Sequence, residues 1–419
     1  MKVLWITFTL FPEAQELYTG NRTTTGSGGW LFNAASSLIN SFPEIDLKVA
    51  CVNAKVKNFT TVQGGQIGYY LIPYGQGFDS YNHGYDRYWQ KITFEFCPDV
   101  VHVHGIEATL ALTYVRACSN KNVVCSIQGL PNIISRYLML GVDKKTIWKN
   151  ITLRDIVRHN TYLSVVKADQ KRAGYIYASM NEVKYFIGRT KWDRTHLWAA
   201  NPSAKYFFCN ETLRDEFYKH KWEYARCKPH TIFLSAVKGI QIFLQALPII
   251  IANYPDTMVY VAGNGNPKNC SFIDRLKMTN FQHIVYNMIK SHHLEGKIEF
   301  LGPLTEESMI KNYLMANVFV CPSTCENSSN SIAEAQLLGV PVVASYVGGT
   351  PDLIPDPDCG TMYRCEEYEM LAGAVCDVFE NANKFDNAHM MEIAARRHNA
   401  KINAETTMNI YRQIINEQN

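Results

Sequence analysis

The sequence predicts an α/β protein built from two doubly wound domains, each with a parallel sheet between layers of helices. Three observations predict this fold. Short apolar runs alternate with helical patterns along residues 2–209, and the alternation begins again along residues 231–345. A charged, irregular stretch at 222–230 separates the two series and is expected to be a linker. The length of 419 residues is enough for two hydrophobic cores.

Each element of the first series follows from a local pattern. Apolar and β-branched runs predict buried strands, and a polar or glycine start followed by apolar residues at helical spacing predicts helices. The expected strands are 2–8, 47–53, a pair within 62–73, 99–104, 123–128, 185–188 and 205–209. The expected helices are 29–38, a long mixed region up to about residue 180, and a polar helix from Asn210.

The second series has clearer boundaries. The expected strands are 231–235, 257–262, 297–301, 318–320 and 340–344, alternating with helices at 240–253, up to 292, 305–314 and 332–338. Gly339 and Pro341 mark the end of the last helix. We expect domains at 1–222 and 231–404, facing each other across a cleft, with a helix at 405–419 that packs back on the first.

Composition narrows the class of protein. Hydrophobic residues make up 47% of the chain and charged residues 19%, which is typical of globular proteins. No apolar run is long enough to span a membrane, and Pro12, Glu13 and Glu16 interrupt the apolar start, so a first strand is expected there rather than a secretion signal. The twelve cysteines have no metal-binding spacing, which indicates reduced thiols and a cytoplasmic protein.

Charge is distributed unevenly. Residues 1–230 carry a net charge of +10, and residues 231–419 carry −7. The stretch 144–228 is the most basic and contains several Tyr and Trp residues. Two interpretations stay open: an ordinary solvated surface, or a surface that meets an anionic acceptor or a membrane.

The strongest functional pattern lies between the strands at 318–320 and 340–344. A polar loop, 327–331, precedes the helix at 332–338, and its backbone N–H groups and the helix dipole favour an anion. Glu326 precedes that loop and Glu334 lies in the helix. Two carboxylates beside an anion site suit a ligand that carries neutral hydroxyls next to a diphosphate, as a sugar nucleotide does.

Other motifs are weaker. Lys238 and Gly239 follow a strand and precede a helix, where a lysine can counter a diphosphate. The glycines near residues 26–29 and 263–265 fail the dinucleotide fingerprint, so they are either turn glycines or sites of close approach to phosphate or acceptor.

Two further patterns involve histidine and aspartate. We expect His102 and His104 to face opposite sides of their strand, with His104 the better site candidate and a structural role an equal alternative. Asp356 and Asp358 flank a proline, and this pattern indicates a loop rather than a metal site.

Taken together, Glu326, Glu334, the 339–345 segment and Gly348-Gly349 resemble the donor-binding signature of the retaining GT-B glycosyltransferases of family 4. The resemblance extends to Lys238-Gly239, 261–265 and 299–303, and in the first half to Gly28-Gly29, 98–104 and 187–194. It implies a GT-B fold of two Rossmann-like domains, an acceptor-binding one followed by a nucleotide-sugar-binding one.

The resemblance also implies roles. Glu334 would hold the donor ribose, Glu326 the donor sugar, and Lys238 the diphosphate. Two departures matter. No arginine closely precedes Lys238, so either Arg189 or Arg194 reaches across or diphosphate binding is weaker, and Gln128 stands where a histidine is common. The candidate catalytic residues are Glu326, Lys238, His104 and Gln128. The candidate donor-binding residues are Glu334, Ser328, Ser329, Asn330, Ser331, Gly263, Gly265, Leu301, Gly302, Arg189 and Arg194, and the candidates on the acceptor or phosphate side are Gly28 and Gly29.

The function that the resemblance implies is retaining, metal-independent transfer of a hexosyl unit from a UDP- or GDP-sugar, with no cofactor. The acceptor would be a glycan or a polyprenyl-diphosphate-linked glycan in the synthesis of bacterial surface polysaccharide such as capsule. Peripheral contact with the inner face of the plasma membrane would use the basic N-terminal half, and no nucleic acid is expected. Two alternatives stay open: a sugar-nucleotide epimerase or hydrolase, and a non-catalytic partner subunit that binds nucleotide sugars.

Overall fold

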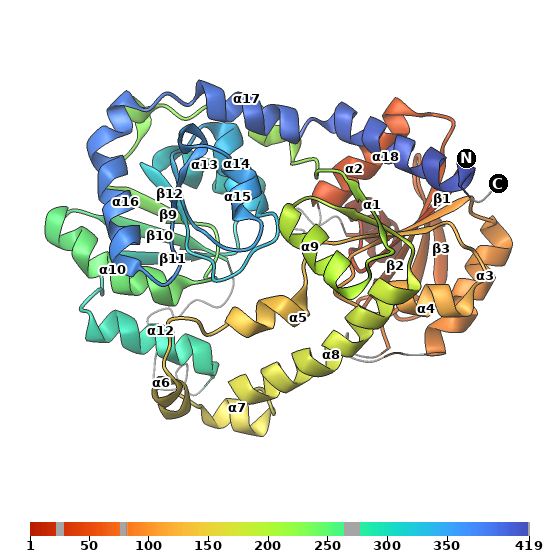
Figure 1. The fold of residues 1–419 in the computed structure, drawn as a ribbon, viewed down its shortest axis with the longest axis horizontal. Helices are drawn as coiled ribbons and strands as arrows, with labels where there is room; N and C mark the ends of the chain where they lie inside the picture. The colour runs from red at the N-terminus through yellow and green to blue at the C-terminus, as the bar shows by residue number, and fades with distance from the viewer. Residues whose placement is uncertain (22–28, 76–80, 82, 264–276, 418–419) are drawn as a thin grey trace. The chain divides into compact units, whose positions relative to one another are not determined.

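The structure is a computed structural model that describes residues 1–21, 29–75, 81, 83–263 and 277–417. The chain divides into two compact units, coloured by residue number in Figure 1. Unit 1 contains residues 1–133, 169–214 and 397–419, and unit 2 contains residues 134–168 and 215–396. Whether these units correspond to the acceptor-binding and donor-binding domains stays a prediction.

Unit 1 is built on an eight-stranded sheet with the order β3-β4-β2-β1-β5-β6-β7-β8. Among the described residues, only the β3–β4 pair of this sheet is antiparallel. The strands are β1 (Lys2–Thr7), β2 (Asp46–Asn53), β3 (Thr60–Gln63), β4 (Gly68–Pro73), β5 (Val100–His104), β6 (Val123–Ser126), β7 (Tyr185–Gly188) and β8 (Lys205–Phe208). Each predicted strand of this series is confirmed to within about two residues.

Helices cover both faces of this sheet. They are α1 (Pro12–Thr19), α2 (Gly29–Ser41), α3 (Asp86–Phe96), α4 (Leu110–Ala117), α9 (Lys191–Ala200) and α18 (Ala400–Asn416), with a short 3₁₀ turn η1 (His83–Tyr85). Alternate residues of β1 point to opposite faces, so Val3 and Trp5 enter one core cluster and Leu4 and Ile6 the other. The polar helix predicted from Asn210 is wrong: the next helical element is the 3₁₀ helix η3 (Asp215–Lys219).

Unit 2 contains a parallel six-stranded sheet with the order β11-β10-β9-β12-β13-β14. The strands are β9 (Thr231–Leu234), β10 (Met258–Ala262), β11 (Ile298–Gly302), β12 (Val318–Cys321), β13 (Val342–Ser345) and β14 (Thr361–Tyr363). The helices are α6 (Lys144–Lys149), α7 (Leu153–Val157), α10 (Ile240–Asn253), α12 (Asn280–Ser291), α13 (Glu306–Met315), α14 (Asn330–Leu338), α15 (Thr350–Leu353), α16 (Tyr368–Asn381) and α17 (Ala388–Arg397). The described part of the unit also contains the 3₁₀ helices η2 (Ser135–Tyr137), η3 (Asp215–Lys219), η4 (Tyr224–Arg226), η5 (Pro357–Cys359) and η6 (Ala382–Lys384).

Two helices cross the division between the units, α5 (Pro131–Ile134) and α8 (Tyr162–Glu182). The stretch 222–230 is irregular, as predicted, but it packs firmly within unit 2. Trp222 is buried, its indole N–H donates to the carbonyl of Ala316 at 2.8 Å, and its backbone N–H donates to Leu338. Of the helices in the described residues, none is both long and apolar enough to cross a membrane.

The strand order of unit 2 fixes where a ligand site can form. The chain runs outward from β9 through β10 to β11, then returns to place β12 beside β9, with Val318 aligned to Ile232. β9 and β12 therefore form the point at which the strand order reverses. Loops leaving the carboxyl ends of two such strands diverge, which leaves space for a ligand.

Candidate functional site

Lys238 and Glu326 both follow strands at this reversal point. Lys238 lies four residues beyond the end of β9, and Glu326 lies five residues beyond the end of β12. The Lys238 Nζ and the Glu326 Oε1 are 2.9 Å apart, which makes them a direct ion pair. Two residues separated by 88 positions in the chain and singled out independently by their sequence context therefore meet.

The two members of this pair have different surroundings. The side chain of Lys238 is 66% exposed, whereas that of Glu326 is only 14% exposed. The Ser323 hydroxyl also donates to Glu326 Oε1, at 3.0 Å. The carboxylate of Glu326 raises the pKa of Lys238, so the lysine stays charged. A cation that is accessible to solvent and held by a fixed carboxylate is well suited to meet an incoming anion.

Two glycines bring the loops together. Gly239 has φ +71°, and a Cβ there would lie 1.7 Å from the carbonyl oxygen of Pro322. Gly348 has φ +52°, and a Cβ there would lie 1.8 Å from the carbonyl oxygen of Glu326. That same carbonyl accepts the backbone N–H of Gly349 at 3.0 Å. Glycine is required at both positions, because only it allows both the left-handed conformation and the close approach.

The helix α14 begins beside this pair. Ser329 is its N-cap residue, and Ser328 to Ser331 span the loop end and the first turn, as predicted. The first backbone N–H groups of a helix have no acceptor within it, so this end is a favourable place for an anion. Gly339 ends the helix in the left-handed conformation, with φ 81°, which confirms the predicted C-cap.

Glu334 lies in α14 and is 7% exposed. Its Oε2 is 3.4 Å from the Tyr313 hydroxyl, which also donates to the backbone carbonyl of Ser331 at 3.0 Å. Tyr313 is itself fully buried on α13. This tyrosine therefore ties Glu334 and the first turn of α14 to the neighbouring helix, and the sequence alone gave no sign of it.

The remaining predicted donor-side residues lie at the ends of β10 and β11. Ala262 aligns with Gly302 across the two strands, and the Gly263 N–H donates to the Gly302 carbonyl at 2.8 Å. Leu301, the residue before Gly302, is partly buried. These ends belong to the same edge of the sheet as Lys238 and Glu326. Gly265 lies outside the described residues.

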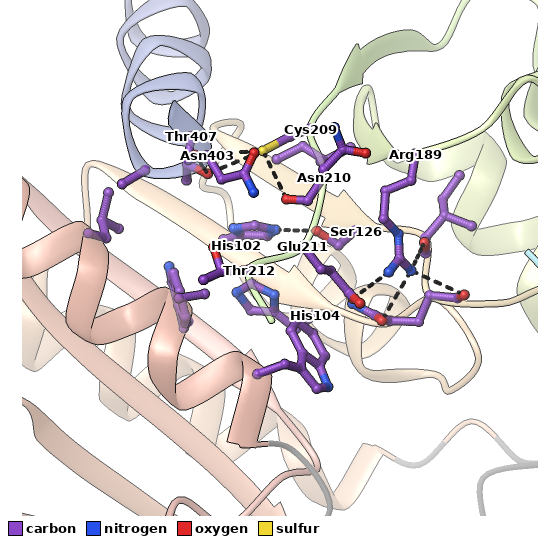
Figure 2. Close-up of a pocket in the computed structure, with 18 residues that line it drawn as sticks. His102, His104, Ser126, Arg189, Cys209, Asn210, Glu211, Thr212, Asn403 and Thr407 are labelled. Carbon is purple, nitrogen blue, oxygen red and sulfur yellow. Dashed lines mark hydrogen bonds and ion pairs between the residues drawn. The ribbon is translucent and has the colours of Figure 1, made fainter. Parts of the chain in front are cut away.

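In unit 1, a small cavity of about 60 Å³ lies at the carboxyl ends of β5, β6 and β7 and contains several predicted residues in its wall (Figure 2). The predicted orientation of His102 and His104 is wrong. Residues two apart on a strand face the same side, and the two rings lie 3.8 Å apart. Both line the cavity, and each also contacts Trp5.

The two histidines differ in their hydrogen bonds. The Trp5 indole N–H donates to the Tyr411 hydroxyl at 2.9 Å, which leaves that hydroxyl to donate to His102 Nδ1 at 2.7 Å. His102 Nε2–H then donates to Ser126 Oγ at 2.6 Å. Burial lowers the pKa of His102 to about 3, so it stays neutral. By contrast, His104 Nε2 is buried without a hydrogen-bond partner, and burial holds its pKa well below the ordinary value.

Arg189 is engaged deep within unit 1. Its Nη1 lies 2.5 Å from Glu211 Oε1, and the two side chains are 5% and 9% exposed. Its Nη2 donates to the side-chain oxygen of Gln128 at 3.2 Å and to the carbonyl of Ile127 at 3.1 Å, as Figure 2 shows. Gln128 is therefore a partner of Arg189 in this wall. A role of Arg189 in donor binding stays a prediction.

Sequence inspection also missed Glu107, which follows β5. Burial raises its pKa to about 7, with Arg189 acting in the opposite direction. A carboxyl group that titrates near neutrality is a typical candidate for proton transfer. The available signal was its position three residues after the end of the predicted strand 99–104, since residues that follow strand ends often line such sites.

The other two predicted residues of unit 1 are more peripheral. The Arg194 guanidinium stacks over the ring of Trp198, with its carbon 4.8 Å from the ring centroid. Gly29 is the first residue of α2. A Cβ added at Gly29 would lie 3.7 Å from Cδ of the Arg214 side chain. Gly28 lies outside the described residues.

Comparison with known proteins gives a family for part of unit 2. Residues 229–381, which include every strand of the sheet in unit 2, match the family described as glycosyl transferases group 1. This match covers 153 of the 419 residues. The predicted GT-B fold is confirmed over the full length: a sucrose-phosphate synthase from Thermosynechococcus elongatus superposes with a TM-score of 0.72 at 14% identity, covering 100% of both chains. Anabaena Alr3699/HepE, solved with UDP and glucose, superposes with a TM-score of 0.63 at 14% identity over 98% of each chain.

Curated relatives match shorter segments. Spore coat protein SA of Bacillus subtilis is 29% identical over 156 residues, which are 36% of this chain and 38% of that protein. A D-inositol 3-phosphate glycosyltransferase of Corynebacterium urealyticum is 26% identical over 174 residues, 42% of this chain and 39% of that protein. The chain thus spans less than two fifths of the length of these relatives.

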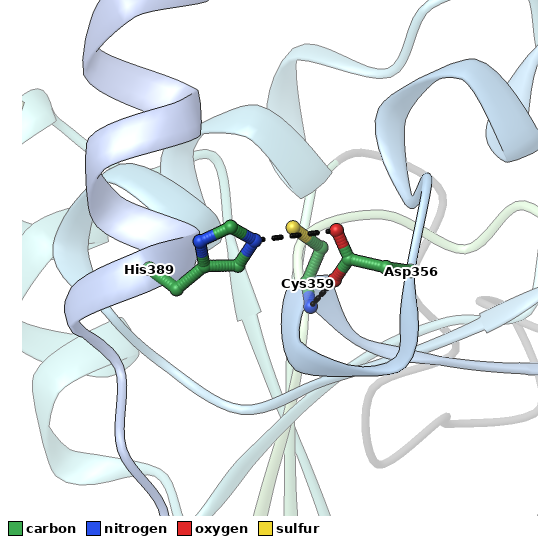
Figure 3. Close-up of side chains that lie close together, drawn as sticks. All are labelled: Asp356, Cys359 and His389. Atoms are coloured by element: carbon green, nitrogen blue, oxygen red, sulfur yellow. Dashed lines mark hydrogen bonds and ion pairs between the residues drawn. The ribbon is translucent and has the colours of Figure 1, made fainter.

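The described part of unit 2 holds a further cluster of ligand-type side chains, Asp356, Cys359 and His389 (Figure 3). Asp356 Oδ1 accepts a hydrogen bond from the backbone N–H of Cys359 at 3.1 Å and so caps η5. The loop predicted at 356–358 therefore contains a single turn of 3₁₀ helix. His389 Nε2 lies 3.3 Å from Asp356 Oδ2. Burial opposes ionisation of Asp356, but the bonds from His389 and Cys359 lower its pKa overall. These contacts cap and fasten the turn, and we assign no metal to them.

Proposed function

We propose that this protein is a retaining glycosyltransferase that moves a hexosyl unit from a nucleotide-sugar donor to a glycan or lipid-linked acceptor. The observation that carries the proposal is the 2.9 Å contact between Lys238 and Glu326 at the strand-order reversal of the group 1 domain. It places a cation and a hydrogen-bond acceptor side by side at the start of α14. A diphosphate next to a sugar needs this pair of groups.

The donor is assigned to this site residue by residue. Lys238 and the N–H groups of residues 328–331 bind the diphosphate, Glu326 accepts hydrogen bonds from the sugar hydroxyls, and Glu334 accepts those of the ribose. Leu301, Gly302 and Gly263 line the base pocket at the ends of β10 and β11. The description of HepE as a complex with UDP and glucose supports a UDP-linked donor, and a GDP-linked donor stays open.

The chemistry follows from the charge that develops on the leaving group. As the bond between the anomeric carbon and the diphosphate oxygen breaks, negative charge builds on that oxygen and Lys238 stabilises it. The acceptor hydroxyl attacks the same face of the sugar and gives its proton to the departing oxygen, so the configuration is retained. Glu326 positions the sugar and takes no proton. The proposed reaction uses neither a metal ion nor a cofactor.

Acceptor recognition is assigned to unit 1. His104 and Gln128 line the cavity there, and their polar side chains suit sugar hydroxyls. The predicted acceptor is a polyprenyl-diphosphate-linked glycan in surface polysaccharide synthesis, such as that of capsule, with the protein in the cytoplasm. No arginine closely precedes Lys238 in the sequence. Lys238 is therefore the side-chain cation that we assign to the diphosphate among the described residues of this site.

Two alternatives make different predictions. An epimerase or hydrolase would consume the donor without an acceptor. A non-catalytic partner subunit would bind nucleotide sugars and release nothing. A relative from Schizosaccharomyces pombe, the gpi3 subunit of a phosphatidylinositol N-acetylglucosaminyltransferase, is 25% identical over 185 residues and is described as a subunit.

The test is nucleotide release from UDP-, GDP- and ADP-sugars, with and without membrane extract as the acceptor source. Acceptor-dependent release from one donor is expected. Lys238→Ala should then lower the rate about 100-fold, because it removes the leaving-group cation. Lys219→Ala is the matched control, since it removes another exposed lysine that pairs with a glutamate, Glu216, in unit 2. Equal rates in the two variants would exclude the proposed site, and acceptor-independent release would favour the hydrolase.

A further inference from the structure

The segment between α5 and α8 carries an unusual exposed surface. Four large apolar side chains lie on α6 and α7, and each is more than half exposed: Trp148 at 60%, Leu153 at 68%, Ile156 at 56% and Val157 at 71%. Leu153, Ile156 and Val157 occur at spacings of three and four residues, so they share one face of α7. Exposed apolar residues gathered in this way indicate a surface that binds something.

This segment is held firmly in place. Asp155 is fully buried, and its Oδ2 accepts the Asn280 N–H at 2.5 Å and the Thr152 hydroxyl at 2.8 Å. The Asn280 side chain donates to the Ile147 carbonyl at 3.0 Å. Asn287 also donates to the Asn150 side chain at 2.7 Å. These contacts fasten α6 and α7 to α12 within unit 2.

This anchoring explains which residues face outward. The inner side of the segment is polar and satisfied by α12, and Ile147 is its buried apolar residue. The outer side carries the apolar residues, which is the reverse of an ordinary surface helix. Since the segment is anchored by its polar groups, the exposed apolar residues contribute nothing to its attachment, and a different role has to account for them.

The charges around these residues identify the occupant. Residues 143–158 contain five basic side chains, Lys144, Lys145, Lys149, Arg154 and Arg158, and two acidic ones: Asp143, which caps α6, and Asp155, which is buried and pairs with Arg154. Apolar side chains framed by lysine and arginine are typical of helices that lie in the interface of an anionic membrane. The tryptophan is also favoured at that depth, because its ring is apolar and its N–H is polar.

We propose that α6 and α7 form a docking face for an anionic lipid bilayer, defined by Trp148, Leu153, Ile156, Val157 and the five basic residues around them. Leu153, Ile156 and Val157 enter the headgroup boundary, and the basic side chains contact lipid phosphates. The face belongs to unit 2, the unit that holds the group 1 domain. The proposal goes beyond the transfer reaction, since it requires no donor and no acceptor.

The test is co-flotation of the full chain with vesicles of phosphatidylcholine, with and without phosphatidylglycerol, in the absence of any sugar nucleotide. Binding is expected only to vesicles that contain phosphatidylglycerol, and it should weaken as salt rises. Leu153→Ser combined with Ile156→Ser and Val157→Ser should abolish binding at every salt concentration. The triple variant Lys144→Gln, Lys145→Gln and Lys149→Gln should partition onto these vesicles about 100-fold more weakly, because each basic side chain contributes about 1 kcal/mol near an anionic surface.

Phe94→Ser is the matched control. Phe94 is 85% exposed on α3 in unit 1, and the nearby Lys91 is paired with Glu95 at 3.7 Å, so Phe94 is an exposed apolar residue outside the docking face. Its variant should bind vesicles as the unmodified chain does. The proposal is wrong if the unmodified chain fails to float, or if the triple serine variant floats equally well. A dimer that the same variant dissociates, without vesicle binding by either, would identify a second copy as the occupant and also refute the proposal.

A nucleotide-release assay on the triple serine variant distinguishes failure of the docking face from failure of the proposed transfer function. The triple serine variant should release nucleotide normally with a water-soluble acceptor, because none of its three residues lies in the donor site. Retained release together with lost flotation is the expected pair of results. Loss of release in a folded variant would contradict the independence of the docking face.

Discussion

Replacing Gly348 with alanine tests how the donor site is held together. A Cβ at this position would lie 1.8 Å from the Glu326 carbonyl oxygen, whereas ordinary contacts begin at 3.4 Å. The carbonyl would therefore have to retreat by about the difference, 1.6 Å. The side chain of Glu326, the residue proposed to position the sugar, would shift with the backbone. Misplacement of about 1 Å in a catalytic group costs on the order of 100-fold in rate.

The left-handed conformation adds a separate cost, and Gly296 controls for it. Gly296 has φ +81° but nothing within 4 Å of an ideal Cβ, so Gly296→Ala incurs only the conformational strain. That strain is about 1–2 kcal/mol of folding stability in either variant. Donor turnover and thermal unfolding should be measured for both proteins. We expect turnover to fall about 100-fold in Gly348→Ala and to stay within a few-fold in Gly296→Ala.

The result that would refute this reasoning is equal turnover in the two variants while both remain folded at the assay temperature. Equal turnover would mean that the Gly348 turn does not determine the position of Glu326. If both variants lost activity equally, strain in the fold would be the cause rather than the contact with Glu326.

Three further predictions concern the surroundings of the sites. Burial raises the pKa of Glu107 from 4.5 to about 7, so between these pH values the folded protein binds more protons than the unfolded one, and stability should fall as pH rises. Glu107→Gln should remove this loss and be about 1–3 kcal/mol more stable than the unmodified chain at pH 8. Urea unfolding at both ends of this pH range measures the difference. Arg189→Met should destabilise unit 1 by roughly 3–5 kcal/mol, since it leaves Glu211 buried and unpaired, and adding Glu211→Gln should recover part of the loss in a double-mutant cycle. Tyr313→Phe should cost about 1 kcal/mol of stability and raise the KM for the donor more than it lowers kcat, because the hydroxyl orients the start of α14 and Glu334 without touching the reacting atoms.

The donor side of the protein was largely predictable from the sequence. Glu326, Glu334 and Gly339 lie within one strand–helix–strand unit, and local spacing determines how such a unit folds. Lys238 was singled out because a lysine between a strand and a helix can counter a diphosphate, and the nearby Glu326–Glu334 pattern pointed to a diphosphate ligand. The tie from Tyr313 was not found, because a buried tyrosine on a helix looks like any core aromatic residue until its hydroxyl has a partner.

The wall of the unit 1 cavity was less predictable. Its contacts join residues that are far apart in the chain: 309 positions separate His102 from Tyr411, and Arg189 and Glu211 come from different loops. A single sequence holds no information on such pairs. The error on His102 and His104 was of a different kind, since the two-residue repeat of a strand already places them on one face.

Unit 1 also has a consequence for synthesis on the ribosome. Its sheet begins with residue 2, yet Tyr411 supplies the hydroxyl that both Trp5 and His102 need. The core around the first strands is therefore complete only after Tyr411 has been made, and unit 2, which ends at residue 396, is made before that. During elongation the early strands would expose apolar surface, so a chain stalled before α18 is the species on which chaperones are expected to act.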